Sequence, residues 1–171
     1  MKYKLLIIFI CLYLVVTGCQ NQTAINGIDA KLRRVVSAQT IEVIINNKSY
    51  QLRLSGLDTP SRKQQPWGDD GKKFLVDFLT ANNTIPLKSA MIILETDVKV
   101  KDKFNRISGY GWFNNELINE KILAEGFGVV NLTYTDGKYD QKLLQAQSYA
   151  RIMEKGIWNP KQPLRNIAKS N

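Results

Sequence analysis

The chain of 171 residues contains no histidine and only two cysteines. Without histidine, a Ser-His-Asp or Cys-His catalytic group and a histidine-ligated zinc site are excluded. Any catalysis must therefore come from carboxylates, arginines, lysines, tyrosines or bound metal ions. Cys11 lies in an apolar run near the N-terminus. If that run is removed, Cys19 is the only thiol left, and a disulfide within the remaining chain is impossible.

The chain also lacks an apolar run of the about 20 residues that cross a bilayer comfortably. The N-terminal run at residues 5–16 is too short and, with Lys2 and Lys4 before it, is typical of a secretory signal. Residues 16–19, Val-Thr-Gly-Cys, resemble the bacterial lipobox, in which cleavage before the cysteine precedes lipid attachment. We therefore expect an exported protein with a signal peptide at residues 1–18. A lipid on Cys19 would anchor it to the bacterial cell membrane or outer membrane. The alternative is an ordinary signal with a cysteine nearby by chance.

Acidic residues are outnumbered, since 15 Asp and Glu face 24 Lys and Arg, for a formal net charge of +9. Removal of residues 1–18 takes away two lysines and no acid, so the charge falls from +9 to +7. This excess favours phosphates or anionic surfaces as partners, although a basic surface often serves only solubility. The remaining length suits one domain with its own core.

Strand-like and helix-like patterns follow one another along this domain. Residues 19–30 are expected to form a polar tether, residues 31–159 the folded domain and residues 160–171 a basic tail. Alternation predicts strands at residues 32–37, 40–45, 50–55, 90–94 with 98–100, and 107–113, with a hairpin turn at residues 46–48. Helical spacing predicts helices at residues 69–79, 116–124 and 141–155. About five strands with one helix inserted and others after them predict a small α+β barrel, expected to be a monomer.

Three segments combine charged residues with turn-forming ones. They are residues 53–60 (Arg-Leu-Ser-Gly-Leu-Asp-Thr-Pro), residues 102–106 (Asp-Lys-Phe-Asn-Arg) and residues 156–158 (Gly-Ile-Trp). In this order they resemble the staphylococcal nuclease (thermonuclease) family over roughly residues 32–158, together with a motif that contains Asn119, Glu120, Leu123 and Gly126. The resemblance implies an OB-fold, a five-stranded β-barrel with about three α-helices. It also implies calcium-dependent hydrolysis of nucleic-acid phosphodiester bonds.

In that family two arginines bind the phosphate, two aspartates and a carbonyl hold calcium, and a glutamate activates water. The resemblance implies that Arg53 and Arg106 are the phosphate-binding arginines, since a planar guanidinium can bond two phosphoryl oxygens at once. It also implies that Asp58 and the carbonyl of Thr59 are calcium ligands, in keeping with the oxygen ligands that calcium prefers.

The chain departs from the family at two acids. The family's Asp-Gly-Asp-Thr loop reads Ser-Ala-Gln-Thr at residues 37–40, so Gln39 takes the place of a metal aspartate, and Ser61 takes the place of the general-base glutamate. Gln39 would keep one oxygen ligand and remove one charge, so calcium binding is expected to be weakened or lost. Glu42, on the opposite strand face, and Asp69 and Asp70, at a helix N-terminus, are not expected to replace the missing acids.

Single-stranded DNA or RNA is the expected partner. Phe104 and Tyr134 match positions where the family places aromatic rings near a bound nucleotide, and Lys103 adds a cation beside Phe104. Base stacking contributes about 1–3 kcal/mol, although an aromatic side chain on a small barrel more often packs against the core. Arg53 and Asp58 could equally be a structural ion pair.

Three functions remain open at this point. The first is a calcium-dependent endonuclease with impaired catalysis, because losing the general base alone costs about 10²–10⁴-fold in rate. The second is an OB-fold nucleic-acid-binding module without catalysis. The third is an envelope interaction domain in which only the lipid anchor matters. Calcium-dependent cleavage supports the first function, salt-sensitive DNA binding without cleavage the second, and neither result the third.

Overall fold

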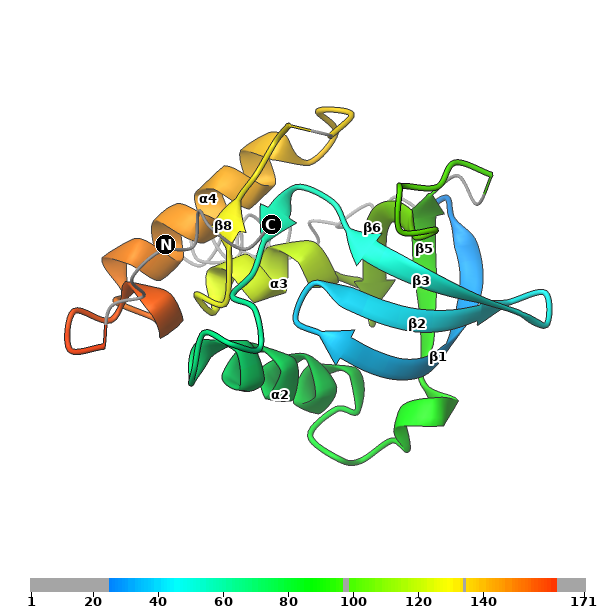
Figure 1. Ribbon diagram of the computed structural model, residues 1–171, viewed down its shortest axis with the longest axis horizontal. Helices are drawn as coiled ribbons and strands as arrows, with labels where there is room; N and C mark the ends of the chain where they lie inside the picture. Colours follow the sequence, from blue (N-terminus) through cyan, green and yellow to red (C-terminus); the bar gives the residue numbers. More distant parts are fainter. Residues whose placement is uncertain (1–24, 97–98, 134, 163–171) are drawn as a thin grey trace, which may run out of the picture.

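The computed structural model describes residues 25–96, 99–133 and 135–162, and its centre is a closed β-barrel (Figure 1). The strands follow the order β3-β2-β1-β5-β6, and a parallel pairing of β3 with β6 closes the barrel. The predicted five-stranded α+β barrel of OB-fold type is therefore confirmed. The barrel strands are β1 (Ile28–Ser37), β2 (Thr40–Ile45), β3 (Lys48–Leu54), β5 (Met91–Thr96) and β6 (Ile107–Phe113).

Three α-helices lie among the described residues, outside the barrel (Figure 1). Helix α2 packs along the β1 side of the barrel and also contacts α3, which in turn packs against α4. The helices are α2 (Trp67–Leu79), α3 (Ile118–Ala124) and α4 (Asp140–Ile152); the short elements are β4 (Leu57–Asp58), η1 (Leu87–Ser89), β7 (Glu116–Leu117), β8 (Val129–Val130) and η2 (Gly156–Trp158). Within the described ranges, no helix is both long and apolar enough to cross a membrane.

Alternation along the strands fills the barrel interior with branched apolar side chains. Leu52 and Leu54 of β3 are completely buried, and so are Ile41 and Val43 of the neighbouring strand β2. Successive residues of a strand face opposite sides of the sheet, so Arg53 lies on the outer side between two core residues. The barrel core thus places an arginine at the outer surface near the end of β3.

Several boundaries differ from those predicted; in particular, the helix expected at residues 116–124 begins at Ile118, because Glu116 and Leu117 form strand β7. Residues 28–30, assigned above to the polar tether, are the first residues of β1, because Ala30 is completely buried and pairs with Ile92 of β5. The hairpin turn is confined to Asn46 and Asn47, whose positive φ values of 49° and 62° suit a tight two-residue turn, and β3 begins at Lys48. Of the strand expected at residues 98–100, Val98 lies outside the described residues, and Lys99 and Val100 do not belong to a strand.

Asn119 connects α3 to the end of the barrel from which β4 emerges. Its side chain is completely buried, and its Nδ2 group donates to the carbonyl of Ser55 at 2.8 Å. Its Oδ1 atom accepts from the backbone N–H of Gly111 at 3.1 Å. A buried amide left without partners costs about 1–3 kcal/mol. This residue of the sequence motif therefore holds the start of the segment that leads from β3 to Asp58.

Candidate active site

The segment after β3 brings Asp58 back beside Arg53 at one end of the barrel. Gly56 has a φ of 80°, which turns the chain between the two strands. Strand β4 then pairs with β8, with Asp58 opposite Val129. Arg53 Nη2 donates to Asp58 Oδ1 at 2.5 Å, and both side chains are about one-third exposed, at 33% and 35%. The site therefore contains an ion pair that solvent still reaches.

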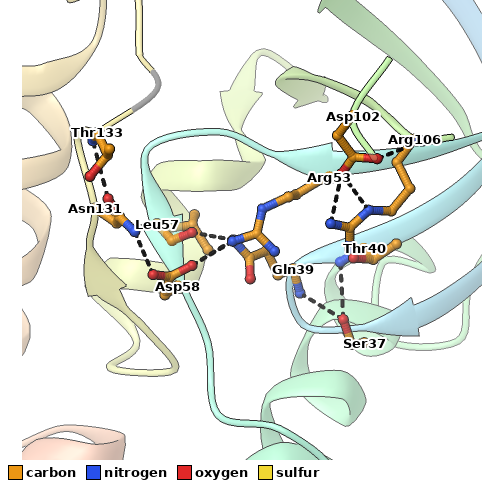
Figure 2. A network of polar contacts seen from close by, with 10 residues as sticks. All are labelled: Ser37, Gln39, Thr40, Arg53, Leu57, Asp58, Asp102, Arg106, Asn131 and Thr133. Atoms are coloured by element: carbon orange, nitrogen blue, oxygen red, sulfur yellow. Dashed lines mark hydrogen bonds and ion pairs between the residues drawn. The ribbon is translucent and has the colours of Figure 1, made fainter. Parts of the chain in front are cut away.

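The Asp58 carboxylate is bound by nitrogen donors at each of its oxygens (Figure 2). Oδ1 accepts from Arg53 at 2.5 Å and from Gln39 Nε2 at 3.3 Å. Oδ2 accepts from Asn131 Nδ2 at 2.6 Å. One guanidinium and two side-chain amides thus surround a carboxylate that the resemblance assigned to calcium.

Gln39 faces this site with its amide nitrogen. Its Nε2 group donates to the carbonyl of Leu57 as well as to Asp58. Because both neighbours are oxygen acceptors, rotating the amide would place oxygen against oxygen and lose both hydrogen bonds. In this geometry Gln39 presents N–H groups to Leu57 and Asp58, and its role as an oxygen ligand for a metal stays a prediction.

The donor set does not fit calcium, which takes about 6–8 oxygen ligands. Asp58 is the carboxylate at this position, and N–H donors already occupy its two oxygens. Gln39 presents its amide N–H groups where the family has an acid. Within residues 25–96, 99–133 and 135–162, no three or more His, Cys, Asp or Glu side chains are grouped so as to hold a metal ion. Thr59, the expected carbonyl ligand, is buried beside this single carboxylate.

The acids near Ser61 are engaged elsewhere. Ser61 itself is held by a pair of contacts with Gln64, whose Oε1 accepts from the Ser61 N–H at 2.8 Å. Asp69 accepts from Gln65 Nε2 at 2.8 Å, at the beginning of α2. Glu42 lies on the outer side of β2, bound to arginines of β1. None of these contacts brings a carboxylate to the position that the resemblance assigns to the general base.

Arg106 belongs to a separate loop that Asp102 organises. Asp102 Oδ1 accepts from the backbone N–H groups of Phe104 and Arg106, each at 2.9 Å. Its Oδ2 accepts from Arg106 Nε at 2.8 Å. Burial alone would raise the pKa of Asp102, but the hydrogen bonds from Arg106 and the backbone outweigh it and hold that pKa below its usual value. Asp102 is therefore a loop-orienting residue.

The two predicted phosphate-binding arginines turn to different carboxylates. Arg53 extends toward Asp58, whereas Arg106 stays beside Asp102 (Figure 2). The guanidinium carbon of Arg106 lies 4.9 Å from the centre of the Phe104 ring, and this ring is 64% exposed. Lys103 Nζ lies 5.2 Å from the same ring. An exposed aromatic ring with two cations thus stands near the site; Tyr134 and Cys19 lie outside the described residues.

Sequence reasoning missed Asn131. Its backbone N–H donates to the carbonyl of Gly56 at 3.1 Å, which places its side chain against Asp58. Its Oδ1 atom accepts from the N–H of Thr133 at 3.1 Å, so the amide cannot rotate without losing two hydrogen bonds. The residue lies 73 positions from Asp58. Only the pairing of β4 with β8 brings them together, and that pairing has no signal in two two-residue strands.

Comparison of the sequence with known proteins finds nuclease relatives. Residues 51–160 match the sequence profile described as "Staphylococcal nuclease homologue". The chain is 31% identical to "Thermonuclease" of Staphylococcus hyicus over 134 residues, which cover 75% of this chain and 75% of that protein. It is 28% identical to "Thermonuclease" of Staphylococcus intermedius over 144 residues, 81% of each chain. It is 27% identical to "Endonuclease YncB" of Bacillus subtilis (strain 168) over 139 residues, 77% of this chain and 62% of that protein.

Proposed function

The chain belongs to the staphylococcal nuclease family, and we propose that it is a thermonuclease-like member that binds single-stranded nucleic acid while its calcium-dependent hydrolysis is impaired. The observation that carries this proposal is the Asp58 carboxylate, whose oxygens accept from Arg53, Gln39 and Asn131. These three N–H donors use most of the about four acceptor sites of a carboxylate, so little capacity is left for a cation. The substrate class follows from the family and from relatives whose names are thermonuclease and endonuclease.

Binding is supported by cations that keep N–H groups available. A guanidinium has five N–H groups. The hydrogen bonds recorded for the Arg53 side chain use only Nη2, and the Arg106 guanidinium is 19% exposed beside the exposed ring of Phe104. Charge-assisted hydrogen bonds to phosphate are about twice as strong as neutral ones. An extended strand could therefore place phosphates on the arginines and a base on Phe104.

Hydrolysis is expected to be slow for two independent reasons. Ser61 cannot act as a general base at neutral pH, and general-base assistance contributes about 10²–10⁴-fold. Gln39 presents N–H groups where the family has a metal carboxylate. The arginines can still stabilise charge on a bound phosphate, because prearranged cations favour charge that develops there.

Binding and cleavage can be separated in one experiment. The full chain would be incubated with fluorescently labelled single-stranded DNA, once with a calcium titration and once with a chelator. We expect binding in both. The logarithm of the binding constant should fall with the logarithm of the salt concentration, with a slope of about −0.7 per neutralised phosphate. Cleavage should be at least about 10²-fold slower than that of the S. hyicus thermonuclease under the same conditions. Fast cleavage that saturates with calcium would contradict the proposal, and the lack of both binding and cleavage would favour an envelope interaction domain.

We also propose that the protein is exported and anchored through a lipid on Cys19, which the lipobox-like residues 16–19 support. A Cys19→Ser variant should lose both processing and the lipid, and should move from the membrane fraction to the soluble fraction. A Cys11→Ser variant is the matched control, because its cysteine lies in the segment expected to be removed. Membrane association of Cys19→Ser equal to that of the parent chain would refute the anchor.

A further inference from the structure

Two consecutive arginines stand on the outer side of β1, where regular alternation would turn one of them inward. Leu32 pairs with Val43 and Arg34 pairs with Glu42, so Arg33 is an extra residue in β1 and forms a β-bulge. A bulge re-aims the side chains around it. Arg33 and Arg34 are consequently 53% and 60% exposed, although Leu32 before them is buried.

Both arginines bind Glu42, whose side chain is only 10% exposed. Arg33 Nη1 donates to Oε1 at 2.6 Å, Arg34 Nε donates to Oε2, and the Ser49 hydroxyl donates to Oε1 at 2.8 Å. The hydrogen bonds from Arg34 and then Ser49 hold the pKa of Glu42 below its usual value, so it is a carboxylate at neutral pH. We name Arg33, Arg34, Glu42 and Ser49 the bulge cluster. Two cations and one anion leave it a net charge of +1.

The bulge cluster has more N–H groups than Glu42 can accept. The recorded contacts use Nη1 of Arg33 and Nε of Arg34. Nε and Nη2 of Arg33 and the two Nη groups of Arg34 remain for a further acceptor, because a guanidinium has five N–H groups. Glu42 fixes the orientation of the arginines, and a fixed guanidinium matches the geometry of phosphoryl oxygens. One arginine would suffice to neutralise Glu42. A structural ion pair alone therefore does not require the second arginine.

The bulge cluster lies on the same outer side of the barrel as Arg53. Strand register places Glu42 opposite Gln51 and Thr40 opposite Arg53, so Arg53 is two residues further along β3. With about 4.8 Å between neighbouring strands and about 3.3 Å per residue, the Cα atoms of Arg34 and Arg53 are roughly 12 Å apart. A nucleic-acid strand that contacts both arginines must therefore carry at least two phosphates.

We propose that the bulge cluster is a second phosphate-binding site, which holds another phosphate of the nucleic-acid strand that is bound at Arg53. The inference rests on the proposed function, since it concerns the same bound strand. It extends the binding site to Arg33 and Arg34 of β1, which lie outside the loop at residues 37–40 and outside residues 53–60 and 102–106. Oligonucleotides too short to reach from Arg53 to the bulge cluster should therefore gain no affinity from it.

Oligonucleotides of two lengths test this assignment on the full chain. Affinities for oligothymidylates of about two and about twelve nucleotides would be measured by fluorescence anisotropy at several salt concentrations. In an Arg33→Gln/Arg34→Gln variant we expect the longer oligomer to bind about 10-fold more weakly, with a salt slope smaller by about 0.7–1.4, because one or two phosphate contacts are lost. The affinity for the dinucleotide should be unchanged.

Two further variants keep the test decisive. Lys121→Gln/Lys142→Gln is the matched control, because each lysine pairs with a glutamate on α3 or just before it, at Glu116 and Glu120. It should bind the longer oligomer like the parent chain. Arg33→Lys/Arg34→Lys keeps the charges beside Glu42 and removes the planar N–H arrangement. This lysine variant should bind the longer oligomer several-fold more weakly than the parent chain does. It provides the test even if the glutamine variant fails to fold.

The outcomes separate this inference from the proposed function. If the parent chain binds the longer oligomer and neither arginine variant weakens it beyond the lysine control, the bulge cluster is a structural ion pair only. If the parent binds no oligomer, the proposed function itself fails. Anionic vesicles containing phosphatidylglycerol form a third arm. Arginine-dependent binding to these vesicles without arginine-dependent binding to DNA would overturn the assignment in favour of lipid headgroups.

Discussion

Asp58 and Glu42 are both carboxylates held by arginine on the outside of one barrel, yet their charge balance differs. Glu42 is 10% exposed and binds two guanidinium groups, whereas Asp58 is 35% exposed and binds one guanidinium and two uncharged amides. The Glu42 site therefore keeps a surplus positive charge. At the Asp58 site the charges of Arg53 and Asp58 cancel.

This difference shows that phosphate binding and phosphodiester hydrolysis have separate requirements on this fold. Attraction needs surplus cations, which strand residues can supply anywhere on the outer surface. Calcium-dependent chemistry needs unsaturated oxygen ligands at one place, and Gln39 and Asn131 supply N–H groups there instead. A family member can therefore lose one capacity without losing the other.

The largest expected effect comes from restoring acids at the Asp58 site. The double substitution Gln39→Asp/Ser61→Glu supplies a second carboxylate and a general base. We expect calcium-dependent cleavage of single-stranded DNA about 10²–10⁴-fold above the parent chain. Each single variant should gain much less, because groups that act in one step are not additive. Initial cleavage rates across a calcium titration measure the effect. A double variant that folds and binds DNA but stays inert would show that Arg53 and Arg106 are not poised for catalysis.

The next effect concerns affinity and compares the two predicted phosphate-binding arginines. Arg53→Ala and Arg106→Ala each remove a guanidinium, and hydrogen bonds to charged groups contribute about 1.5–3 kcal/mol. We expect single-stranded DNA to bind about 10- to 100-fold more weakly in each variant. Lys88→Ala, an exposed cation on η1, is the matched control and should change affinity little. Equal affinities in all three variants would remove these arginines from the binding site.

A smaller effect is expected on stability, where Glu42→Ala and Asp58→Ala should lower the free energy of unfolding by different amounts. Glu42→Ala removes hydrogen bonds from two arginines and a serine in a mostly buried position, at a cost of about 1–2 kcal/mol in the free energy of unfolding. Asp58→Ala should cost less, since solvent screens its ion pair. Glu116→Ala, whose carboxylate is 46% exposed, is a control with an expected cost below about 0.5 kcal/mol. Urea denaturation gives the three values, and an Asp58→Ala cost larger than that of Glu42→Ala would reverse the order proposed here.

The smallest expected effect is on how the contribution of Glu42 to the free energy of unfolding depends on pH. The folded-state pKa of Glu42 is lowered from its ordinary value of 4.5 by hydrogen bonds from Arg34 and Ser49. A lowered folded-state pKa contributes stability above the unfolded value and loses it as pH falls through the folded value. The stability advantage of the parent over Glu42→Gln should therefore shrink as pH falls from about 6 to about 3. Urea midpoints that fall in parallel for both proteins would show that other acids dominate.

Much of the barrel could be predicted from alternation alone. The strands at residues 40–45 and 107–113 have the predicted bounds, and turn residues delimit both. In residues 40–45 branched apolar residues recur at every second position. The bulge at Arg33 could not be placed in this way, because alternation assigns consecutive residues to opposite faces. Two consecutive arginines inside an otherwise alternating strand are a signal of a bulge that could have been used.

The sequence predicted which residues form most of the candidate site, but not how their side chains are oriented or which hydrogen bonds they make. Motif matching identified Arg53, Asp58 and Gln39, because position along the chain is what a motif records. The orientation of the Gln39 amide depends on the acceptors around it, namely the carbonyl of Leu57 and the carboxylate of Asp58. The contact with Asn131 depends on a strand pairing between distant segments. Both are tertiary effects that local patterns do not contain.

The short pairing of β4 with β8 has a consequence for the dynamics of the site. It consists of two residue pairs, Leu57 with Val130 and Asp58 with Val129, and Asn131 follows directly. Short pairings of this kind open locally at a lower free energy than the rest of a fold. Each opening would withdraw Asn131 and return Oδ2 of Asp58 to solvent, while Arg53 and Gln39 still bind Oδ1 and the five barrel strands stay closed. Hydrogen exchange at the Asn131 backbone amide, which donates to Gly56, would report this opening.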